Sequence, residues 1–443
     1  MNKKKEISIS AASDNGTGTP APLVYSRSEH NISRQKIDPD ALKIMYRLLR
    51  HGYKAFLVGG GVRDLLLNKQ PKDFDIGTDA TPRKIKALFR NSRIIGRRFK
   101  LVHVFFRGNR NIEVSTFRAQ SEPGEDSHDG GSHELGQHDN IYGDESTDAL
   151  RRDITINGLF YDISSFSVID YVGGMQDLKD RVIRVIGDPG KRFEEDPVRL
   201  LRVVRHAART SFSIEPACWQ SLVSNHHLIS KSSAVRVYEE LKKDLSCGHL
   251  ATILKLLSQS GLLNDLLPEL AERKDLIFDE RHPFFTAVSE IDRQAQSGQP
   301  PSATVVLAIM VLLYQLPLSA PTVSLNEDEV GHWIDEAFTV LQVPRKERER
   351  IEQLIRAYLD ISCGDAEKVK LGYLAKKPYF EDLISLTGIL STCLQNEGAV
   401  ALIEEAKHYR SRERKQLRES PPPGRGRRRK PGGRHIMGLR RTT

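Results

Sequence analysis

A short glycine-rich segment constrains this chain more than any other feature. Residues 55–58 form an apolar run that predicts a strand, the glycines at 59–61 predict a turn, and residues 62–67 predict a helix. Backbone N–H groups at such a turn can bind phosphate, and Arg63 can add a positive charge. An ordinary turn would look the same, so the segment supports a phosphate site only together with other features.

Two aspartates follow in the sequence KDFDI, the first of them nine residues after Asp64, where the segment GGGVRD ends. Residues two apart on a strand point to the same side, so Asp73 and Asp75 share one face while Phe74 and Ile76 face the core. Two carboxylates this close repel each other unless a cation lies between them. Mg²⁺ prefers such oxygen ligands, and two Mg²⁺ ions are the usual means of in-line nucleotidyl transfer. A solvated strand end is the alternative, which the neighbouring turn disfavours.

A third carboxylate is available in a second β-rich region. Residues 101–106 and 111–117 flank a polar turn and predict a β-hairpin. Alternation puts Ile112 and Val114 on one face and Glu113 on the other. An acid in the middle of a strand either faces solvent or belongs to a site, so Glu113 is the candidate third metal ligand.

Adjacent arginines occur in the segment RRDITIN. Arg151 and Arg152 can clamp a triphosphate with forked, charge-assisted hydrogen bonds. Asp153 and Asn157 can hold ribose hydroxyls or magnesium-bound groups. A surface ion pair is the alternative for this segment.

The segment RFEEDPVRLLR predicts a helix that opens at Glu195, with Pro197 in its first turn. Asp196 and Arg199 lie three residues apart, so we expect them to be neighbours that offer an acceptor and donors to the edge of a base. Arg202 follows on the polar face of this helix. A salt-bridged helix face would have the same pattern.

Composition divides the chain into parts that predict an α+β fold, with a mixed-sheet head, an all-α neck and body, and a basic tail. The expected helices outside the segments above are residues 37–49, 235–245, 251–266, 303–313 and 382–393. The expected parts are a disordered N-terminus at 1–33, a head at 34–190 with a flexible insertion at about 119–140, a neck at 191–260, a body at 261–407 and a disordered Arg-rich tail at 408–443.

The positive charge is concentrated at the C-terminus. Residues 410–443 contain 13 Lys and Arg and two acids, so the rest of the chain carries −2 of the net charge of +9. Such a tail suits an arm that holds a polyanion such as RNA. The residues expected to contact RNA there are Arg425, Arg427, Arg428, Arg429 and Lys430.

The remaining patterns argue against several other classes of protein. The four cysteines have no CxxC spacing, and the histidines His103, His128, His133 and His138 match no metal-ligand pattern, so we expect reduced thiols and a solvated histidine-containing loop. The first ten residues contain no apolar stretch typical of a signal peptide, and the longest apolar run is too short to span a bilayer. These features predict a cytoplasmic protein.

In this order and combination, the segments LVGGGVRD, KDFDI, RRDITIN and EEDPVRLLR resemble the class II nucleotidyltransferases of the polymerase-β superfamily. This family contains the bacterial poly(A) polymerases and the CCA-adding tRNA nucleotidyltransferases, and the resemblance runs from about residue 43 to about residue 245. Any one segment alone would be unspecific.

The resemblance implies a role for each matching residue. Asp73, Asp75 and Glu113 would be catalytic and would hold two Mg²⁺ ions, with ATP as substrate. Asp153 is grouped with the catalytic acids, although a binding role fits it equally. The implied nucleotide-binding residues are Gly59, Gly60, Arg63, Asp64, Arg151, Arg152, Asn157, Asp196, Arg199 and Arg202, of which the last three would select the base.

Three features favour the poly(A) polymerase branch: the stretch IGRRFKLVH, the stretch DNIYGDESTDALRRD and the Arg-rich tail. The implied activity is template-independent polyadenylation of RNA 3′ ends with release of pyrophosphate, as in mRNA processing. A CCA-adding or A-adding tRNA nucleotidyltransferase is one alternative, and a catalytically silent RNA-binding protein on the same fold is another. The expected partners are single-stranded RNA 3′ ends, ATP and RNA-decay proteins, and a monomer is the default oligomeric state.

Overall fold

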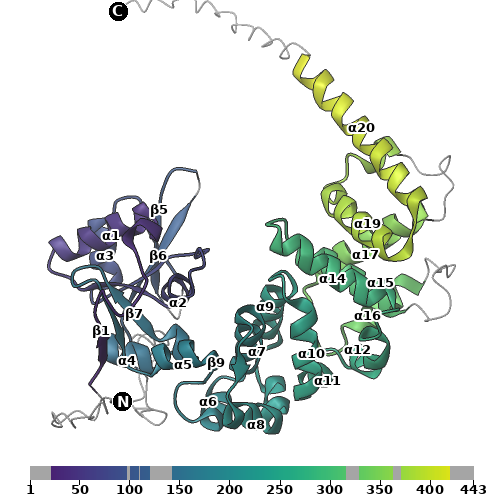
Figure 1. Ribbon diagram of the computed structural model, residues 1–443. Coiled ribbons are helices and arrows are strands. Elements are labelled where there is room, and N and C mark those ends of the chain that lie inside the picture. The colour runs from purple at the N-terminus through teal and green to yellow at the C-terminus, as the bar shows by residue number, and fades with distance from the viewer. Residues whose placement is uncertain are drawn as a thin grey trace, which may run out of the picture.

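The computed structural model describes residues 21–96, 100–108, 110–119, 142–315, 329–362 and 371–419. These residues form a head with a mixed β-sheet, followed in chain order by a helical neck and a helical body (Figure 1). The expected α+β class is confirmed. The predicted insertion at about 119–140 lies almost wholly outside the described residues, as does the end of the tail with Arg425, Arg427, Arg428, Arg429 and Lys430.

The head is built on an eight-stranded sheet with the order β1-β8-β7-β2-β3-β6-β5-β4. Neighbouring strands are antiparallel except β3 and β6, which are parallel. The strands are β1 (Leu23–Tyr25), β2 (Ala55–Val58), β3 (Asp75–Thr78), β4 (Ser92–Ile95), β5 (Leu101–Phe105), β6 (Asn111–Thr116), β7 (Leu159–Asp162) and β8 (Ser167–Asp170).

The two faces of this sheet have different cores. On one face, α1 (Pro39–Arg50) and α3 (Pro82–Leu88) bury Leu57, Ile76 and Val114. The opposite face has a smaller aromatic cluster around Val58, Phe117 and Phe160. The head also contains the helices α2 (Gly60–Leu66), α4 (Glu145–Leu150) and α5 (Gly174–Asp180), with short 3-10 turns at Arg34–Lys36 and Thr155–Asn157.

The neck and body share one continuous apolar core. In the neck, the short parallel pair β9 (Val182–Ile183) and β10 (Ser213–Ile214) lies among the helices. The neck helices are α6 (Pro189–Glu195), α7 (Arg199–Thr210), α8 (Pro216–Asn225) and α9 (Ala234–Leu245), with a 3-10 turn at His226–Lys231. The body helices are α10 (Leu250–Ser260), α11 (Leu262–Leu266), α12 (Pro268–Glu272), α13 (Lys274–Ile277), α14 (Pro283–Gln296), α15 (Ala303–Tyr314), α16 (Val330–Ala337), α17 (Arg345–Ser362), α18 (Leu371–Leu374), α19 (Phe380–Leu394) and α20 (Glu397–Glu419).

Three expected boundaries are wrong. Residues 23–25 are not disordered but pair with β8 as an edge strand, because Leu-Val-Tyr is a short run of good strand formers. The helix expected at 251–266 is divided by Gly261, which adopts φ +87° and ends α10. Residues 408–419 belong to α20, since this stretch has no Gly or Pro and is rich in residues that favour helices.

Among the described residues, no helix is long and apolar enough to cross a membrane. The strongly apolar helix α15 is buried from Val305 to Tyr314.

Candidate functional site

The acidic residues of the site lie on the sheet face opposite α1 and α3. In the parallel pair β3–β6, Ile76 is aligned with Val114 on the helix-covered face, so Asp75 and Glu113 are the next aligned pair and point to the other face. Asp73 is exposed and lies just before β3. The sequence prediction that Phe74 and Ile76 face the core is confirmed by their burial.

The carboxylate of Asp75 is influenced by the negative charges of two other acidic side chains. The pKa of Asp75 is raised to about 6, mainly by burial and also by the negative charges of Glu113 and Asp73, while Arg152 opposes the shift. The pKa of Glu113 is also raised, mainly by burial. A cation near these groups would therefore offset an unfavourable concentration of negative charge.

The donor atoms of this cluster suit Mg²⁺, which prefers carboxylate oxygens. Within the described ranges, however, no three His, Cys, Asp or Glu side chains are gathered tightly enough to form a metal-ligand cluster. Mg²⁺ is usually held by one or two carboxylates and completed by water and substrate phosphates. The arrangement fits a site that is completed by its substrate, rather than a closed protein cage.

The glycine-rich turn approaches the acidic cluster closely. Gly59 has φ +71° and ψ −140°, a conformation that is essentially restricted to glycine. A Cβ atom on Gly59 would lie 3.2 Å from Nη1 of Arg152, and one on Gly61 would lie 3.3 Å from the carbonyl oxygen of Asp73. Glycine therefore allows the turn, with Gly60 at the start of α2, to pack against both the arginine and the acidic strand.

Arg151 and Arg152 are held by a single buried acid, Asp148, at 2% side-chain exposure. Arg152 donates to Oδ2 of Asp148 at 2.8 Å and lies over the ring of Phe160 at 5.3 Å. Arg151 donates to Oδ1 of the same carboxylate. Asp148 was not among the residues predicted from the sequence, although its spacing of three and four residues from the arginines is typical of ion pairs on a helix.

Arg63 and Asn157 form a buried polar network beneath the turn. The guanidinium of Arg63 donates to Asp64 at 2.7 Å and to Oδ1 of Asn157 at 2.7 Å, and the residue is only 4% exposed. The amide of Asn157 is 3.3 Å from Nε2 of His206 on α7. In this placement Arg63, Asp64 and Asn157 connect the glycine-rich turn to the neck.

Asp153 lies between the head and the arginines of α7. Its Oδ1 accepts from Nε of Arg199 at 2.9 Å, and its Oδ2 accepts from Nη1 of Arg202 at 2.5 Å. Burial would raise the pKa of Asp153, but these two arginines outweigh it and lower the pKa. Arg192 adds to this junction by donating to the carbonyl oxygens of Arg151 and Arg152 at 2.8 and 2.9 Å.

The expected helix start at Glu195 is wrong. Glu195 ends α6, Asp196 is extended with φ −148° and ψ 91°, and Arg199 begins α7. The cause is Pro197, since a residue that precedes proline is forced out of the helical region. Oδ2 of Asp196 accepts from Arg236 at 3.0 Å, whereas its Oδ1 is buried without a hydrogen-bond partner among the described residues.

A chain of charged side chains that was not predicted from the sequence continues from the site into α9. Arg202 donates to Oε1 of Glu240 at 3.0 Å, and Arg205 donates to its Oε2 at 2.6 Å. Arg205 also binds Asp244. Burial would raise the pKa of Glu240, but the charge of Arg202 and the hydrogen bonds from Lys243 and Arg205 lower it to about 2. No local pattern connects residues that lie 35 to 38 positions apart.

Two family models match this part of the chain. Residues 55–184 match the poly A polymerase head domain, and residues 211–274 match the probable RNA and SrmB-binding site of polymerase A. The poly(A) polymerase I of Escherichia coli O157:H7 is 48% identical over 256 residues, which are 57% of this chain and 54% of that protein. The poly(A) polymerase I of Haemophilus influenzae is 37% identical and covers 61% of each chain.

CCA-adding enzymes are also similar, at lower identity. The enzyme of Lactobacillus helveticus is 32% identical over 62% of this chain and 64% of its own length. The solved CCA-adding enzyme of Bacillus stearothermophilus in complex with CTP has a TM-score of 0.56 at 23% identity, over 85% of this chain and 83% of that chain. This structural likeness concerns the fold.

The chain spans between about half and two thirds of the length of these relatives by sequence. The first matched region contains the glycine-rich turn, the acidic strands, Arg151 and Arg152, whereas Arg192, Arg199 and Arg202 lie between the two matched regions. Residues 55–184 of this chain are therefore similar to the head domain of poly(A) polymerases, and residues 211–274 are similar to the probable RNA-binding segment of the same enzymes.

Proposed function

We propose that this chain is a polynucleotide adenylyltransferase that adds AMP from ATP to RNA 3′ ends without a template. The observation that carries this proposal is the convergence of Asp75, Glu113 and Arg152 beside the Gly59 turn on one face of the sheet. Acidic side chains that can hold a metal ion therefore lie next to a guanidinium group that can bind phosphate. This is the charge arrangement that phosphoryl and nucleotidyl transfer require.

In the proposed reaction the RNA 3′-hydroxyl attacks the α-phosphate of ATP. A bond forms between the 3′ oxygen and the α-phosphorus, the bond to the bridging oxygen breaks, and pyrophosphate leaves. Arg152 binds the triphosphate, Arg151 assists it, and Asp148 fixes the direction of both guanidinium groups. The strained Gly59 turn keeps space open beside Arg152.

Asp73 and Asp75, with Glu113, would hold magnesium ions. Bound Mg²⁺ would lower the pKa of the attacking hydroxyl and neutralise the departing pyrophosphate.

Asp196 and Arg199 are the proposed base-selecting pair. The buried Oδ1 of Asp196 has an unused acceptor position among the described residues, and Nη2 of Arg199 has no partner in that part of the chain either. Adenine offers an amino donor beside a ring-nitrogen acceptor on its Watson–Crick edge, and cytosine offers the same pattern. An acceptor beside a donor on the protein therefore favours these two bases over guanine and uracil. Asp153 and Arg202 would position this pair.

This shared pattern leaves the CCA-adding alternative open. Support for the poly(A) branch comes from the higher identity to poly(A) polymerase I than to the CCA-adding enzyme of L. helveticus, 48% against 32%. The Arg-rich C-terminal segment supports the same branch, because non-specific phosphate contacts suit RNA of any sequence.

The proposal is tested by single-nucleotide incorporation. The purified chain and Mg²⁺ would be given each labelled nucleoside triphosphate in turn, with either an unstructured RNA or a tRNA that lacks its CCA end. We expect long A tracts on the unstructured RNA and none with the Asp73→Ala, Asp75→Ala variant. Addition confined to the tRNA and ending when CCA is complete would establish the CCA alternative, and no incorporation at all would favour the silent RNA-binding protein.

Base selection makes a separate prediction. In Asp196→Asn, the carboxamide can donate as well as accept, so the ratio of kcat/KM for ATP over GTP should fall about tenfold. Steady-state kinetics on the same RNA measure this ratio. Asp188→Asn is the matched control, because Asp188 caps α6 and Asn caps a helix equally well. A variant that loses kcat for both nucleotides alike would contradict the assignment of Asp196.

We further propose a cytoplasmic location, with RNA-decay proteins as partners. The three described cysteines are unpaired, and burial raises the pKa of the Cys218 thiol to about 12. Thiols that are neutral and unpaired are typical of a reducing compartment.

A further inference from the structure

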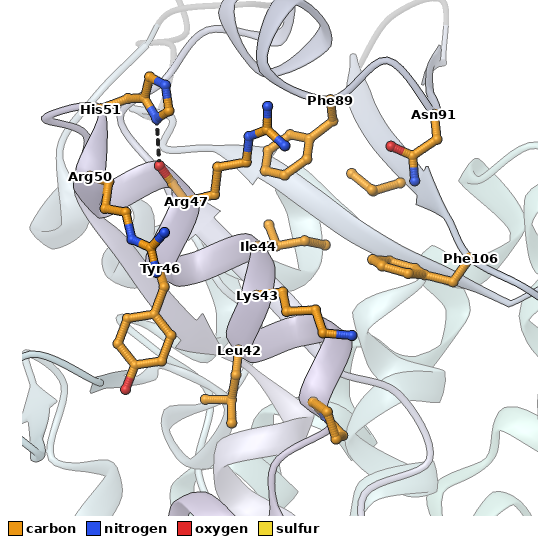
Figure 2. A pocket seen from close by; sticks show the side chains of 12 residues that line it. Leu42, Lys43, Ile44, Tyr46, Arg47, Arg50, His51, Phe89, Asn91 and Phe106 are labelled. Atoms are coloured by element: carbon orange, nitrogen blue, oxygen red, sulfur yellow. Dashed lines mark hydrogen bonds between the residues drawn. The ribbon is translucent and has the colours of Figure 1, made fainter.

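The outer side of the head carries a groove of about 730 Å³ (Figure 2). Helix α1 forms one wall, and Phe89 and Phe106 contribute to the other. This side of the sheet is covered by α1 and α3, whereas Asp75 and Glu113 point to the opposite face. The groove is therefore separate from the proposed catalytic site.

The rim of this groove is basic and its floor is apolar. Helix α1 contributes Lys43, Arg47 and Arg50, and His51 follows its last residue. Ile44 lies between them toward the floor (Figure 2). The guanidinium of Arg47 lies over the ring of Phe89, 5.3 Å from its centroid. The end of α1 is also held in place, because Nδ1 of His51 is 2.8 Å from the carbonyl oxygen of Arg47.

The charge of the rim is not neutralised by nearby acids. Among the described residues, neither Arg47 nor Arg50 has a carboxylate partner. The acids at the start of α1 are already used, since Asp40 pairs with Lys43 at 2.8 Å and Asp38 pairs with Arg110 at 2.5 Å. Two unpaired guanidinium groups beside an apolar floor attract an anion that also has a flat apolar part.

We propose that this groove binds the body of the single-stranded RNA whose 3′ end is extended, and this proposal rests on the proposed function. Single-stranded nucleic acid is recognised by cations that follow its backbone and by planar groups on which bases stack. Arg47, stacked on Phe89, presents a guanidinium plane, and Phe106 presents an aromatic surface. Arg50 lies one turn of α1 further on and supplies a second phosphate contact.

The sheet also offers a short path between the two sites. Strand β4 is the edge of the sheet, next to β5, and its Arg93 is exposed together with Ile94 and Ile95. Arg90 is exposed just before this strand. An RNA that leaves the catalytic face around this edge meets cations before it reaches the groove.

The test is RNA binding by the full chain with Arg47→Glu and Arg50→Glu combined, measured by fluorescence anisotropy without ATP. An oligo(A) of about 20 nucleotides is longer than the stretch that one nucleic-acid-binding fold covers. For this RNA we expect Kd to rise about tenfold or more. Loss of two phosphate contacts should also reduce the slope of log Kd against log salt concentration by about 1.4. For an oligo(A) of about four nucleotides, which only fills the catalytic site, KM should change less than about twofold.

The matched control reverses two exposed charges at the opposite edge of the sheet, Arg27→Glu with Lys179→Glu. An equal rise in Kd for this control would overturn the proposal, because the effect would then come from net charge alone. The number of ATP molecules bound per chain should be the same in the wild type and in the variant. If the variant bound one ATP fewer, the groove would be a site for a free nucleotide, and the RNA assignment would be overturned. If Arg47→Glu with Arg50→Glu lowers the thermal midpoint of unfolding, the test uses Arg47→Gln with Arg50→Gln instead. An unchanged Kd for the long RNA in that variant would reject the groove as an RNA site.

Failure of this inference and failure of the proposed function are distinguishable. Normal AMP addition by wild type, together with groove variants that bind RNA like the control, would reject the groove alone. Groove-dependent RNA binding without any AMP addition would reject the proposed activity and keep the groove.

Discussion

Replacement of Asp75 by Asn should lower the rate of AMP addition by about three orders of magnitude, because the amide is a poor magnesium ligand and metal stabilisation is worth several kcal/mol. The same change should not lower the thermal midpoint in metal-free buffer. Burial and the charges of Glu113 and Asp73 disfavour the carboxylate of Asp75, so a neutral side chain relieves repulsion. Primer extension and thermal unfolding on the same preparation measure both quantities.

Asp79→Asn is the matched control, since Asp79 follows β3 directly, is exposed and accepts from the backbone N–H of Lys54 at 2.8 Å. An amide oxygen can accept the same hydrogen bond, so this variant should retain activity and stability. If Asp75→Asn lost stability in proportion to activity, Asp75 would be a structural residue and the catalytic assignment would fail.

Replacement of Glu240 by Gln should destabilise the neck by about 3 kcal/mol, because it leaves the buried Arg205 and the partly buried Arg202 without their shared counter-charge. The KM for ATP should also rise about tenfold, since Arg202 holds Asp153, which in turn holds Arg199. Denaturant unfolding and ATP kinetics measure the two effects.

The loss of stability in Glu240→Gln should depend on pH in a definite direction. The pKa of Glu240 is lowered to about 2, so its contribution to stability is fully present above its ordinary pKa and is lost as the pH falls through about 2. The difference between wild type and Glu240→Gln should therefore be large at neutral pH and smaller at about pH 3. A difference that grows toward low pH would contradict the ion-pair account.

The neighbouring Glu239→Gln is the control for this experiment. Glu239 lies on the same helix but is 56% exposed, and among the described residues it pairs only with Lys242, at 2.7 Å. Solvent-exposed pairs of this kind contribute little, so we expect a change below about 0.5 kcal/mol.

The sequence predicted those elements whose signals are local. The strand at residues 55–58, the hairpin around 107–110 and the buried helix from residue 303 are present with nearly the expected bounds, because periodicity and turn residues report on them directly. The edge strand β1 was missed because three residues are too few to show alternation. The break between α6 and α7 was not predicted, although Pro197 disfavours a helical conformation for the residue before it, Asp196.

The residues of the candidate site also divide into those with a local sequence signal and those without one. Asp73, Asp75 and the glycine-rich turn could be found from sequence because strand periodicity and φ preferences are local properties. Glu240 and Arg236, the side-chain partner of Asp196, lie about 40 residues from the groups that they hold, so only the packing of α9 shows their role. Asp148 is intermediate, since its spacing to Arg151 and Arg152 was visible but its burial was not.

The central claim is that this chain transfers AMP from ATP to a free RNA 3′-hydroxyl, and one measurement tests it most directly. Wild type would be incubated with Mg²⁺, ATP labelled in its α-phosphate, and the same unstructured RNA ending in either a 3′-hydroxyl or a 3′-deoxy sugar, while pyrophosphate is counted. The account predicts label only on the RNA with a 3′-hydroxyl, one pyrophosphate for each AMP added, and neither product with Asp75→Asn. RNA binding without transfer of label, or transfer that persists in Asp75→Asn, would contradict it.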